Sequence, residues 1–505
     1  MIALSRINAA IAAPEDYFAI KVVDESTDRG VPMVQLATTN SITHVTDSNG
    51  LIAFHEPGLM DQKVWFDVTS HGYEMPANGF GMRGIALDVK PGGSATIKIK
   101  RLNIAERLHR ITGQGIYRDT VMLGQKAPIA QPLLNAQVMG QDSIQAAVYR
   151  DKLYWFWGDT SQVAFGLGLF EMAGATSLPA DQIDPAIGYG LNYFTGENGF
   201  ARAMAPIEGD GVVWVMGVVV VPDESGKERM LAHFHRRQGL GEVFEQGFVL
   251  YNDEKEQFEK HSTIALDAKI TPAGYPTRVK DSDGTDYLYF AAPYPCIRVR
   301  ADMRHYVDLD KYETFTCLKP GTFWIDEKSA QLDRDASGKL IWAWKKSTGR
   351  VEPREQQELV DAGKMKREES PFRLQNAATG NPILLHGGSV FYNHYRKRYI
   401  MTASEFMGDT TVGETWYAEA DKPEGPWQHA VKIITHANVK NDAHDFYNPV
   451  QHPFFDREGG RFIFIEGTYV NTFSGGVRPT PHYEYNQIMY RLDLADERLR
   501  PAQKE

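Results

Sequence analysis

Two aspartates, Asp142 and Asp159, stand where the chain could bring a pair of carboxylates together. Asp142 opens a strand-like segment in Gly140-Gln-Asp-Ser143, and Asp159 ends the aromatic segment Trp155-Phe-Trp-Gly-Asp-Thr160. Two antiparallel strands joined by the short turn at Arg150-Asp151 would place these ends side by side. A carboxylate pair is what transfer of a glycosyl group to water needs, one as proton donor and one as nucleophile or base. The alternative is that Asp159 ends a strand and caps a turn.

Two glutamates compete with Asp159 for the role of the acid. Glu466 lies in Ile465-Glu-Gly-Thr468, at the place in its repeat that matches Trp157, and Glu405 lies in Ala403-Ser-Glu-Phe406. Both stand in strand-like runs, where a carboxylate can equally be structural. The catalytic candidates are therefore Asp142, Asp159, Glu466 and Glu405.

Polar and aromatic residues at the starts of strand-like segments are candidate substrate contacts. Sites for small polar ligands combine apolar faces with a few convergent hydrogen-bonding groups. The candidates for substrate binding are Gln141, Trp157, Arg202, Tyr275, His386, Tyr447, Asn448 and His452. The alternative interpretation is structural, because a lone histidine is usually so and because alternation along a strand buries one aromatic face.

The segment from Asn441 to His452 contains two histidines and two aspartates, all of them side chains that can bind a divalent metal. Their spacing matches no regular metal-binding motif. A hydrogen-bonding rim for a polar ligand is the preferred interpretation. No cofactor is expected to be required, and a divalent cation such as calcium is compatible with these residues.

The elements that must position these residues form a weak repeat between residues 139 and 494. Five times, a small or polar opener is followed by an apolar strand, a charged turn and an aromatic-rich strand. The openers are Gly140, Gly199, Gly274, Gly387 and Phe446. Such repeats are typical of propeller blades, whose innermost strands line a central axis, so the five openers should converge on one pocket. The apolar run from Val212 to Val221 predicts a buried strand.

Short strand-like runs between turn signals such as Asp47-Ser-Asn-Gly50 and Pro91-Gly-Gly93 predict a separate small sandwich near the N-terminus. The expected fold class is all-β, a five-bladed β-propeller preceded by this β-sandwich. The expected divisions are a tail (1–15), the sandwich (16–102), a connecting segment (103–138), the propeller (139–494) and a second tail (495–505).

Three local features lie outside the regular pattern. Ile104 to Ile111 predicts two helical turns in the connecting segment. An insertion at about 323–381 contains a hairpin candidate, Leu332 to Trp344, and a charged helix candidate, Pro353 to Lys366. The two cysteines, Cys296 and Cys317, flank a hairpin-like segment and are interpreted as two buried thiols or as a cross-strand disulfide.

The composition, 42% hydrophobic and 24% charged over 505 residues, is typical of a globular protein. No apolar run reaches the roughly 18 residues of a membrane-spanning helix. The net charge of −11 without a dense Lys/Arg cluster argues against nucleic acid as a partner. Arg6 and Asn8 interrupt the alanine-rich start, so it is not a convincing signal peptide. A periplasmic or secreted location is expected if a leader was removed, and the oligomeric state stays open.

The order of motifs in the first part resembles the transthyretin-like, carboxypeptidase-regulatory-like sandwich. The motifs are Val22-Val-Asp24, Gly30-Val-Pro32, Val45-Thr-Asp-Ser-Asn-Gly-Leu-Ile-Ala-Phe54 and Ser70-His-Gly-Tyr73. The resemblance implies an accessory module in which Asp47 forms a turn and is not a catalyst.

Gly140-Gln-Asp-Ser143 together with Trp155-Phe-Trp-Gly-Asp-Thr160 resembles the five-bladed propeller glycosidases, a group that includes arabinanases, xylosidases and anhydrogalactosidases. The second motif is especially similar to an endo-D-arabinanase family formerly described as a domain of unknown function. The resemblance implies that Asp142 is the general base. The arabinanase pattern also has a glutamate acid in blade three and a modulating aspartate in blade two. Here Gly274-Tyr-Pro-Thr277 and Gly199-Phe-Ala-Arg202 offer no carboxylate, so the acid must be Asp159 or come from a later blade.

The favoured interpretation is a carbohydrate-active enzyme, a glycoside hydrolase that cleaves a poly- or oligosaccharide with a carboxylate pair at the propeller axis. A polysaccharide lyase acting on a uronate is the first alternative, with Tyr275, His386, Tyr447 or His452 as its base. A non-catalytic sugar-binding propeller is the second. A scaffold protein without a deep polar pocket is the third.

Overall fold

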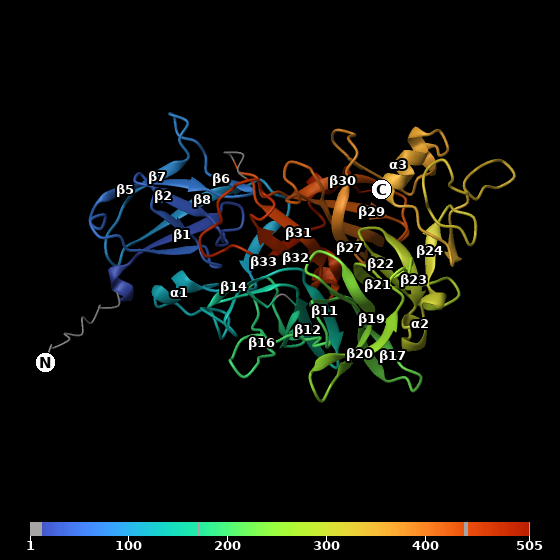
Figure 1. The fold of residues 1–505 in the computed structure, drawn as a ribbon. Coiled ribbons are helices and arrows are strands. Elements are labelled where there is room, and N and C mark those ends of the chain that lie inside the picture. Colours follow the sequence, from blue (N-terminus) through green and yellow to red (C-terminus); the bar gives the residue numbers. More distant parts are fainter. Residues whose placement is uncertain (1–12, 170, 439–442, 504–505) are drawn as a thin grey trace.

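The chain is built almost entirely of strands over residues 13–169, 171–438 and 443–503, which the computed structural model describes (Figure 1). Its α-helices are short: α1 (Arg118–Met122), α2 (Met303–Tyr306) and α3 (Pro353–Asp361). The predicted all-β class is confirmed. None of the helices in these ranges has the length and apolar character that crossing a membrane requires.

Two four-stranded sheets form the N-terminal sandwich. The first has the order β4-β1-β8-β6, with β1 (Phe18–Asp24), β4 (Leu51–Phe54), β6 (Tyr73–Glu74) and β8 (Ser94–Arg101). The second has the order β3-β2-β5-β7, with β2 (Gln35–Thr38), β3 (Thr43–Val45), β5 (Lys63–Thr69) and β7 (Gly84–Asp88). Alternating residues of both sheets, such as Ile20, Leu36, Phe66 and Ile97, are buried in one shared core. The sandwich is thus held by the period-two alternation that its sequence shows.

Asp47 ties the sandwich to helix α1. Its Oδ1 accepts the N–H groups of Asn49 (2.9 Å) and Leu51 (3.2 Å), which closes the turn before β4. Its Oδ2 accepts both the N–H (2.6 Å) and the hydroxyl (2.7 Å) of Thr120 in α1. Asp47 is fully buried. A buried carboxylate that satisfies four donors is structural, as its place in the turn predicted.

Five sheets follow along the chain and make the blades of the propeller. Blade one is β11 (Gln145–Tyr149), β12 (Lys152–Trp157), β15 (Ala173–Ser177) and β16 (Asn192–Tyr193). Blade two is β17 (Val212–Pro222), β18 (Glu228–Arg237), β19 (Val243–Asn252) and β20 (Gln257–Ile264). Blade three is β21 (Tyr275–Lys280), β22 (Asp286–Ala291), β23 (Pro295–Arg300), β24 (Glu313–Thr316) and β25 (Ala343–Lys346). The run from Val212 to Val221 is therefore the buried strand that was predicted.

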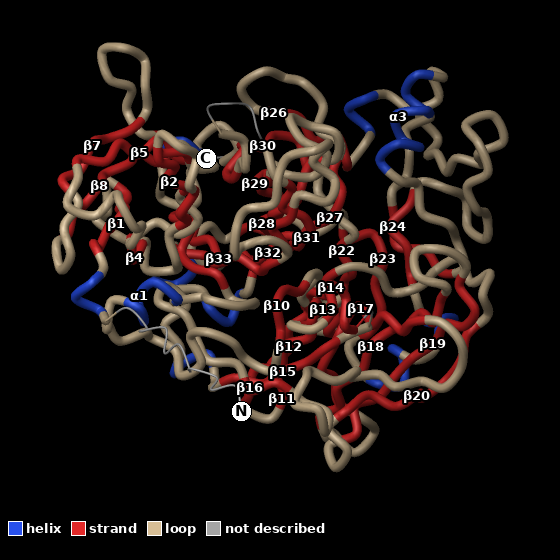
Figure 2. The backbone as a smooth tube through the Cα atoms, turned by 60° about the vertical axis from the view of Figure 1, so that its left-hand side comes forward, coloured by secondary structure: helices blue, strands red, loops and turns tan. Residues whose placement is uncertain are grey.

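Blade four is β27 (Leu385–Asn393), β28 (Arg398–Glu405), β29 (Thr415–Ala420), β30 (Trp427–Ile434) and β26 (Phe372–Asn376). Blade five is β31 (Asp445–Gln451), β32 (Phe462–Val470), β33 (Asn486–Asp493) and β9 (Glu106–Arg110). The first strand of each blade contacts the first strand of the next, from β11 through β17, β21 and β27 to β31. These contacts run around the propeller, and Figure 2 shows β11, β17, β27 and β31 within their blades.

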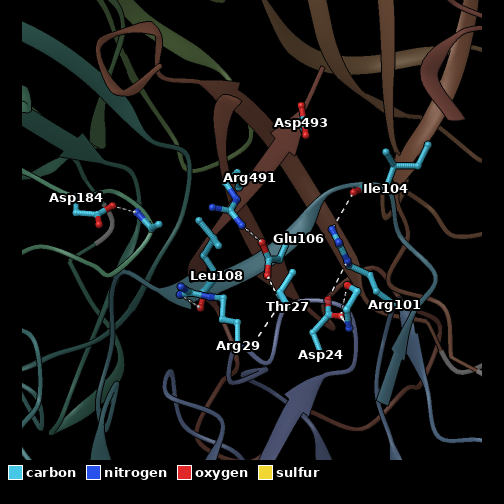
Figure 3. Close-up of polar contacts among 12 residues, drawn as sticks. Asp24, Thr27, Arg29, Arg101, Ile104, Glu106, Leu108, Asp184, Arg491 and Asp493 are labelled. Carbon is cyan, nitrogen blue, oxygen red and sulfur yellow. Dashed lines mark hydrogen bonds and ion pairs between the residues drawn. The ribbon is translucent and has the colours of Figure 1, made fainter. Parts of the chain in front are cut away.

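Strand β9 closes the ring, because a segment that precedes blade one pairs antiparallel with the last strand of blade five. The prediction of two helical turns over Ile104 to Ile111 is therefore wrong. All five residues of β9 are buried, and pairing with β33 outweighs the local helical pattern. Figure 3 shows that β9 also contacts the sandwich: Glu106 pairs with Arg491 of β33 and accepts from Thr27 (3.0 Å).

A second correction concerns the opener of blade two. The segment Gly199 to Met204 does not begin the innermost strand, since that strand is β17 itself and starts at Val212. The segment instead lies beside blade one, where Thr195 bridges Ala201. Blade one has an additional small sheet, β10 (Val138–Gln141), β13 (Thr160–Gln162) and β14 (Phe165–Leu169), in the order β10-β13-β14.

The insertion of blade three is only partly regular. The predicted helix over Pro353 to Lys366 forms but ends at Asp361, and within the predicted hairpin Arg334 bridges Leu340. Cys296 and Cys317 are both buried and free, so the interpretation as two thiols holds and the disulfide does not form.

Replacing Asp47 by alanine should destabilise the protein by about 2–4 kcal/mol, because four buried donors lose their acceptor. The fall in the midpoint of urea-induced unfolding, followed by tryptophan fluorescence, measures this loss. Asp28→Ala is the matched control, since its carboxylate makes an exposed ion pair with Lys98. Equal effects of the two substitutions would contradict the structural role of Asp47.

Candidate functional site

A cavity of about 570 Å³ lies at one end of the propeller axis. Every blade contributes to its lining from the beginning or the axial end of its innermost strand. Its described lining includes Asp142, Ser143, Asp159, Trp214, Leu240, Tyr275, His386, Phe406, Tyr447, Asn448 and Phe473. Of the expected openers, Gly274 and Gly387 line this cavity, as do residues close to Gly140 and Phe446, whereas the segment of Gly199 does not reach it.

Irregularities in three innermost strands turn side chains toward the cavity. The ladder of β31 shifts register between Tyr447 and Val450, and that of β27 shifts between Leu385 and Gly388. The ladder of β17 shifts between Met216 and Val219, next to Gly217 with φ of +62°. A bulge breaks the strict alternation of a strand, so neighbouring residues can face the same side. Tyr447 and Asn448 both line the cavity for this reason.

The two aspartates are brought together as their spacing predicted. Strands β10 and β13 pair Gln141 with Thr160, one residue from each aspartate. The N–H of Gly158 donates to the backbone carbonyl of Asp142 at 2.7 Å. Both carboxylates line the same cavity. They come from the segments that enter and leave the first hairpin of blade one.

Asp142 is surrounded by hydrogen-bond donors. The hydroxyl of Tyr447 donates to its Oδ2 at 2.7 Å. Burial raises the pKa of Asp142 above its ordinary value, while hydrogen bonds from Tyr447, Tyr485, Ser143 and the backbone of Asp159 lower it. Donors stabilise the ionised form, so this carboxylate is the one that carries the charge.

Asp159 lies in a poorer environment for a charge. Burial, followed by the proximity of Asp142, raises the pKa of Asp159 to about 7. The indole N–H of Trp214 donates to Oδ1 of Asp159 at 3.1 Å. This hydrogen bond lowers the pKa of Asp159 and partly offsets the rise. Near pH 7 Asp159 is therefore partly protonated, so it can donate a proton under neutral conditions. Two carboxyls whose environments push their pKa values apart are suited to opposite roles in proton transfer.

The rim of the cavity is apolar. Leu240 is 85% exposed, and Phe406 and Phe473 are 41% and 49% exposed. The ring of Phe406 stacks on His386 at 6.2 Å between centroids, and that of Phe473 meets Tyr447 edge-on at 5.8 Å. Burial lowers the pKa of His386, which favours its neutral form. The rim thus offers apolar faces and a neutral imidazole.

Of the residues proposed from the sequence, six line the cavity: Asp142, Asp159, Tyr275, His386, Tyr447 and Asn448. The hydroxyl of Tyr275 donates to the carbonyl of Asn448 at 3.4 Å. The side chain of Asn448 donates to Ser143 at 2.9 Å, so these residues support one another. Their common origin is the axial end of an innermost strand or the turn before it.

The other six lie elsewhere. Glu466 is fully buried and is bonded to His452 (2.9 Å) and to the indole of Trp157 (3.4 Å), and none of the three lines the cavity. Gln141 is buried and donates to Thr160 at 3.0 Å. Glu405 accepts the indole N–H of Trp416 at 2.8 Å. In each case the side chain points into a blade instead of the axis.

Arg202 is also outside the cavity, because the segment that contains it does not open blade two. Its guanidinium donates to Gln257 and to the carbonyls of Lys255 and Glu256. It lies over the ring of Phe194 at 5.7 Å. These contacts of Arg202 hold the edges of blades one and two together.

The structure adds two residues that sequence reasoning missed. Trp214 was inside a run interpreted only as a buried strand, although alternation from Val213 would have placed Trp214 on the other face. Tyr485 precedes β33 in an irregular segment and adopts φ of +56°, so no periodicity marks it. Their contacts with Asp159 and Asp142 come from blades two and five, which only the closed ring brings to blade one.

The segment between β32 and β33, residues 471–485, is held by the sandwich and by β9. The hydroxyl of Tyr469 bridges His71 (3.0 Å) and Thr480 (2.8 Å). The guanidinium of Arg110 lies over the ring of Tyr483 at 4.2 Å. Because this segment supplies Phe473 to the rim and Tyr485 to Asp142, the sandwich contributes indirectly to the geometry of the site.

Within the described ranges, no cluster of three or more His, Cys, Asp or Glu side chains is arranged to hold a metal ion. Asn441 and Asp442, part of the segment considered for a metal, lie outside the described residues. Of that segment, Nε2 of His444 donates to the carbonyl of Arg478 (3.1 Å), and His452 pairs with Glu466. These two histidines therefore serve separate structural contacts.

No family model matches the sequence, and no curated protein matches it. Solved structures with a similar fold include an exo-β-1,3-galactanase from Phanerochaete chrysosporium with galactose (11% identity, covering 77% of this chain and 65% of that one, TM-score 0.38). A GH43_1 enzyme from Xanthomonas citri complexed with xylotriose is similar at 12% identity (70% and 86%, TM-score 0.33). An exo-1,5-α-L-arabinanase from a bovine ruminal metagenomic library is similar at 10% identity (70% and 93%, TM-score 0.32). Similarity at this level transfers no activity to this chain.

Asp159→Asn should raise the melting temperature at about pH 8, and the gain should vanish at about pH 4. The pKa of Asp159 in the folded protein, about 7, lies above the ordinary value of 3.8. As pH rises between these values, Asp159 ionises in the unfolded state but not in the folded state, and this difference lowers the stability of the folded protein. Thermal unfolding at the two pH values measures the difference. Asp88→Asn, an exposed position on the sandwich, is the control and should change neither melting temperature. A gain of equal size at both pH values would contradict the raised pKa.

Proposed function

We propose that the protein is a glycoside hydrolase, with Asp142 and Asp159 as its catalytic pair. The observation that carries this proposal is that two carboxylates face one cavity with pKa values pushed in different ways by their surroundings. Hydrolysis of a glycosidic bond uses such a pair. Asp159 donates its proton to the departing glycosidic oxygen as the C–O bond breaks. Asp142 supplies the electron pair, by taking a proton from water or by attacking the anomeric carbon.

The hydrogen bonds divide these roles. Tyr447, Tyr485 and Ser143 keep Asp142 in the ionised form that a base or nucleophile needs. With its pKa at about 7, a large fraction of Asp159 is protonated under neutral conditions, as a general acid must be. Trp214 orients Asp159 through its indole N–H. The anomeric configuration of the first product, followed by proton NMR, distinguishes direct attack from activation of water.

The substrate of this reaction is a neutral carbohydrate. Among the described residues that line the cavity, none is a lysine or an arginine. The polar groups are carboxyls, hydroxyls, amides and the imidazole of His386, which suit sugar hydroxyls. Apolar faces at Trp214, Phe406 and Phe473 suit the C–H faces of a sugar ring.

A polysaccharide lyase is less well supported by the same lining. Lyase chemistry removes a proton next to a uronate carboxylate, whose charge must be neutralised. No cationic side chain among the described lining residues is placed to do so. The hydroxyl of Tyr447, one of the candidate bases, is committed to Asp142.

Wild-type protein should release reducing sugar from at least one member of a panel of neutral polysaccharides and aryl glycosides. Asp142→Asn should lose about a thousandfold in kcat on every substrate, because both modes of attack need its carboxylate. Asp159→Asn should lose as much on the natural linkage but far less on an aryl glycoside with a good leaving group, which departs without a proton. Unsaturated uronate products would instead indicate a lyase, and binding without products a non-catalytic propeller.

In each of two variants, only one limb of the pH profile of kcat/KM should shift. Trp214→Phe removes a donor to Asp159, so the pKa of this acid rises and the alkaline limb moves to higher pH. Tyr447→Phe removes a donor to Asp142, so the pKa of this base rises and the acidic limb moves to higher pH. Tyr275→Phe is the matched control, because its hydroxyl bonds a backbone carbonyl, and both limbs should stay in place. A shift of the other limb in either variant would reverse the assignment of acid and base.

A further inference from the structure

A second cavity, of about 550 Å³, lies next to the catalytic pair. Tyr485 is among the residues that line this second cavity, and its side chain hydrogen-bonds Asp142, which lines the first. Ser161 and Gln162, which follow Asp159 by two and three residues, also line it. The segments that carry or contact the two carboxylates therefore border both cavities.

The walls of the second cavity differ in character. The turn between β13 and β14 contributes Val163 and Phe165, which are 55% and 67% exposed. Other segments contribute the polar residues Gln114, His482 and Glu484. An apolar face together with a few polar groups is the arrangement in which a sugar ring places its C–H face and its hydroxyls. Apolar side chains that stay exposed beside a cavity often mark a binding surface.

The polar wall is built for a neutral ligand. No lysine or arginine occurs among the described residues that line this cavity. Glu484 is held by its own segment, because its Oε1 accepts the backbone N–H of Asn471. Burial lowers the pKa of His482, which favours the neutral imidazole. Amide and imidazole groups of this kind pair with hydroxyls.

The backbone that carries this wall is strained and held in place. His482 and Tyr485 adopt φ of +66° and +56°, which residues other than glycine rarely do. Arg110 of β9 fixes the segment by donating to the carbonyl of His482 and by lying over Tyr483. Strain that the surroundings maintain is found where side chains must be aimed at a ligand.

We propose that the second cavity binds further sugar units of the same carbohydrate chain whose glycosidic bond lies between Asp142 and Asp159. The enzyme should therefore prefer longer substrates, and Phe165 is the residue that determines this preference. The proposal rests on the proposed hydrolase function and adds to it a binding site outside the first cavity. Tyr485 then contacts both the bound chain and the catalytic base.

The test is the dependence of kcat/KM on chain length. The substrates are an oligosaccharide ladder prepared from the neutral polysaccharide that the wild type cleaves, together with an aryl glycoside of its terminal sugar. For the wild type, kcat/KM should rise with length and then level off. Phe165→Ala should lower kcat/KM about tenfold on the long oligosaccharides and remove this rise. Phe165→Trp should restore it, because an aromatic face is present again.

Two further variants make the outcome decisive. Phe80→Ala, 91% exposed in a sandwich loop, is the matched control and should leave the whole length profile unchanged. Gln114→Ala, in another segment of the lining, should weaken the long substrates in the same way as Phe165→Ala and tests the site independently of the β13–β14 turn. Equal effects of Phe165→Ala on short and long substrates, or no effect on either, would overturn the second site while hydrolysis stands. Absence of cleavage by the wild type on the whole panel would overturn both proposals.

Discussion

Asp142 is a partly buried carboxylate at the cavity, and the rest of the site depends on how its charged form is stabilised. Removing a carboxylate from water costs several kcal/mol unless donors replace the lost hydration. The donors come from Tyr447 of β31, Tyr485 before β33, and the neighbouring Ser143 and Asp159. Two of these belong to blade five and two to blade one, so they meet only when the ring is closed. The pairing of β9 with β33 completes the blade that supplies both tyrosines, and thus links the closure of the fold to the chemistry of the site.

Much of the fold and half of the site could be predicted because they follow from local pattern. Alternation and turn residues indicate strands, and the spacing of Asp142 and Asp159 across a short hairpin places them together. The failures have a common cause in long-range pairing. The segment Ile104 to Ile111 has a helical pattern, yet a strand far away in sequence recruits it into blade five. The carboxylate of Glu466 could serve as a catalytic group, but its position in the alternation of β32 directs the side chain to His452. Bulges move residues by one position, so strict alternation does not foresee that Asn448 joins Tyr447 at the cavity.

The sandwich acquires a role from its position beside blade five. Its His71 bonds Tyr469, which in turn bonds Thr480, and β9 contributes Arg110 against Tyr483. Burial lowers the pKa of His71 well below its usual range, so the seam is formed by neutral hydrogen bonds and ring contacts. Ordering a long irregular connection between two strands costs conformational entropy. Here packing against a second module offsets that cost, and the ordered segment presents Phe473 to the first cavity and Tyr485 to Asp142.

The apolar lining of the first cavity connects recognition with catalysis. Trp214 and Phe473 offer surface for the C–H face of a sugar, and the same low-polarity surroundings raise the pKa of Asp159 by disfavouring its charge. Under the proposed hydrolase function, a bound sugar would displace water from this wall and disfavour the charge further, which would strengthen the hold of Asp159 on its proton. Asp142 would be less sensitive to the same change, because its donors are protein groups. Substrate binding would then widen the separation between the pKa values of the acid and the base.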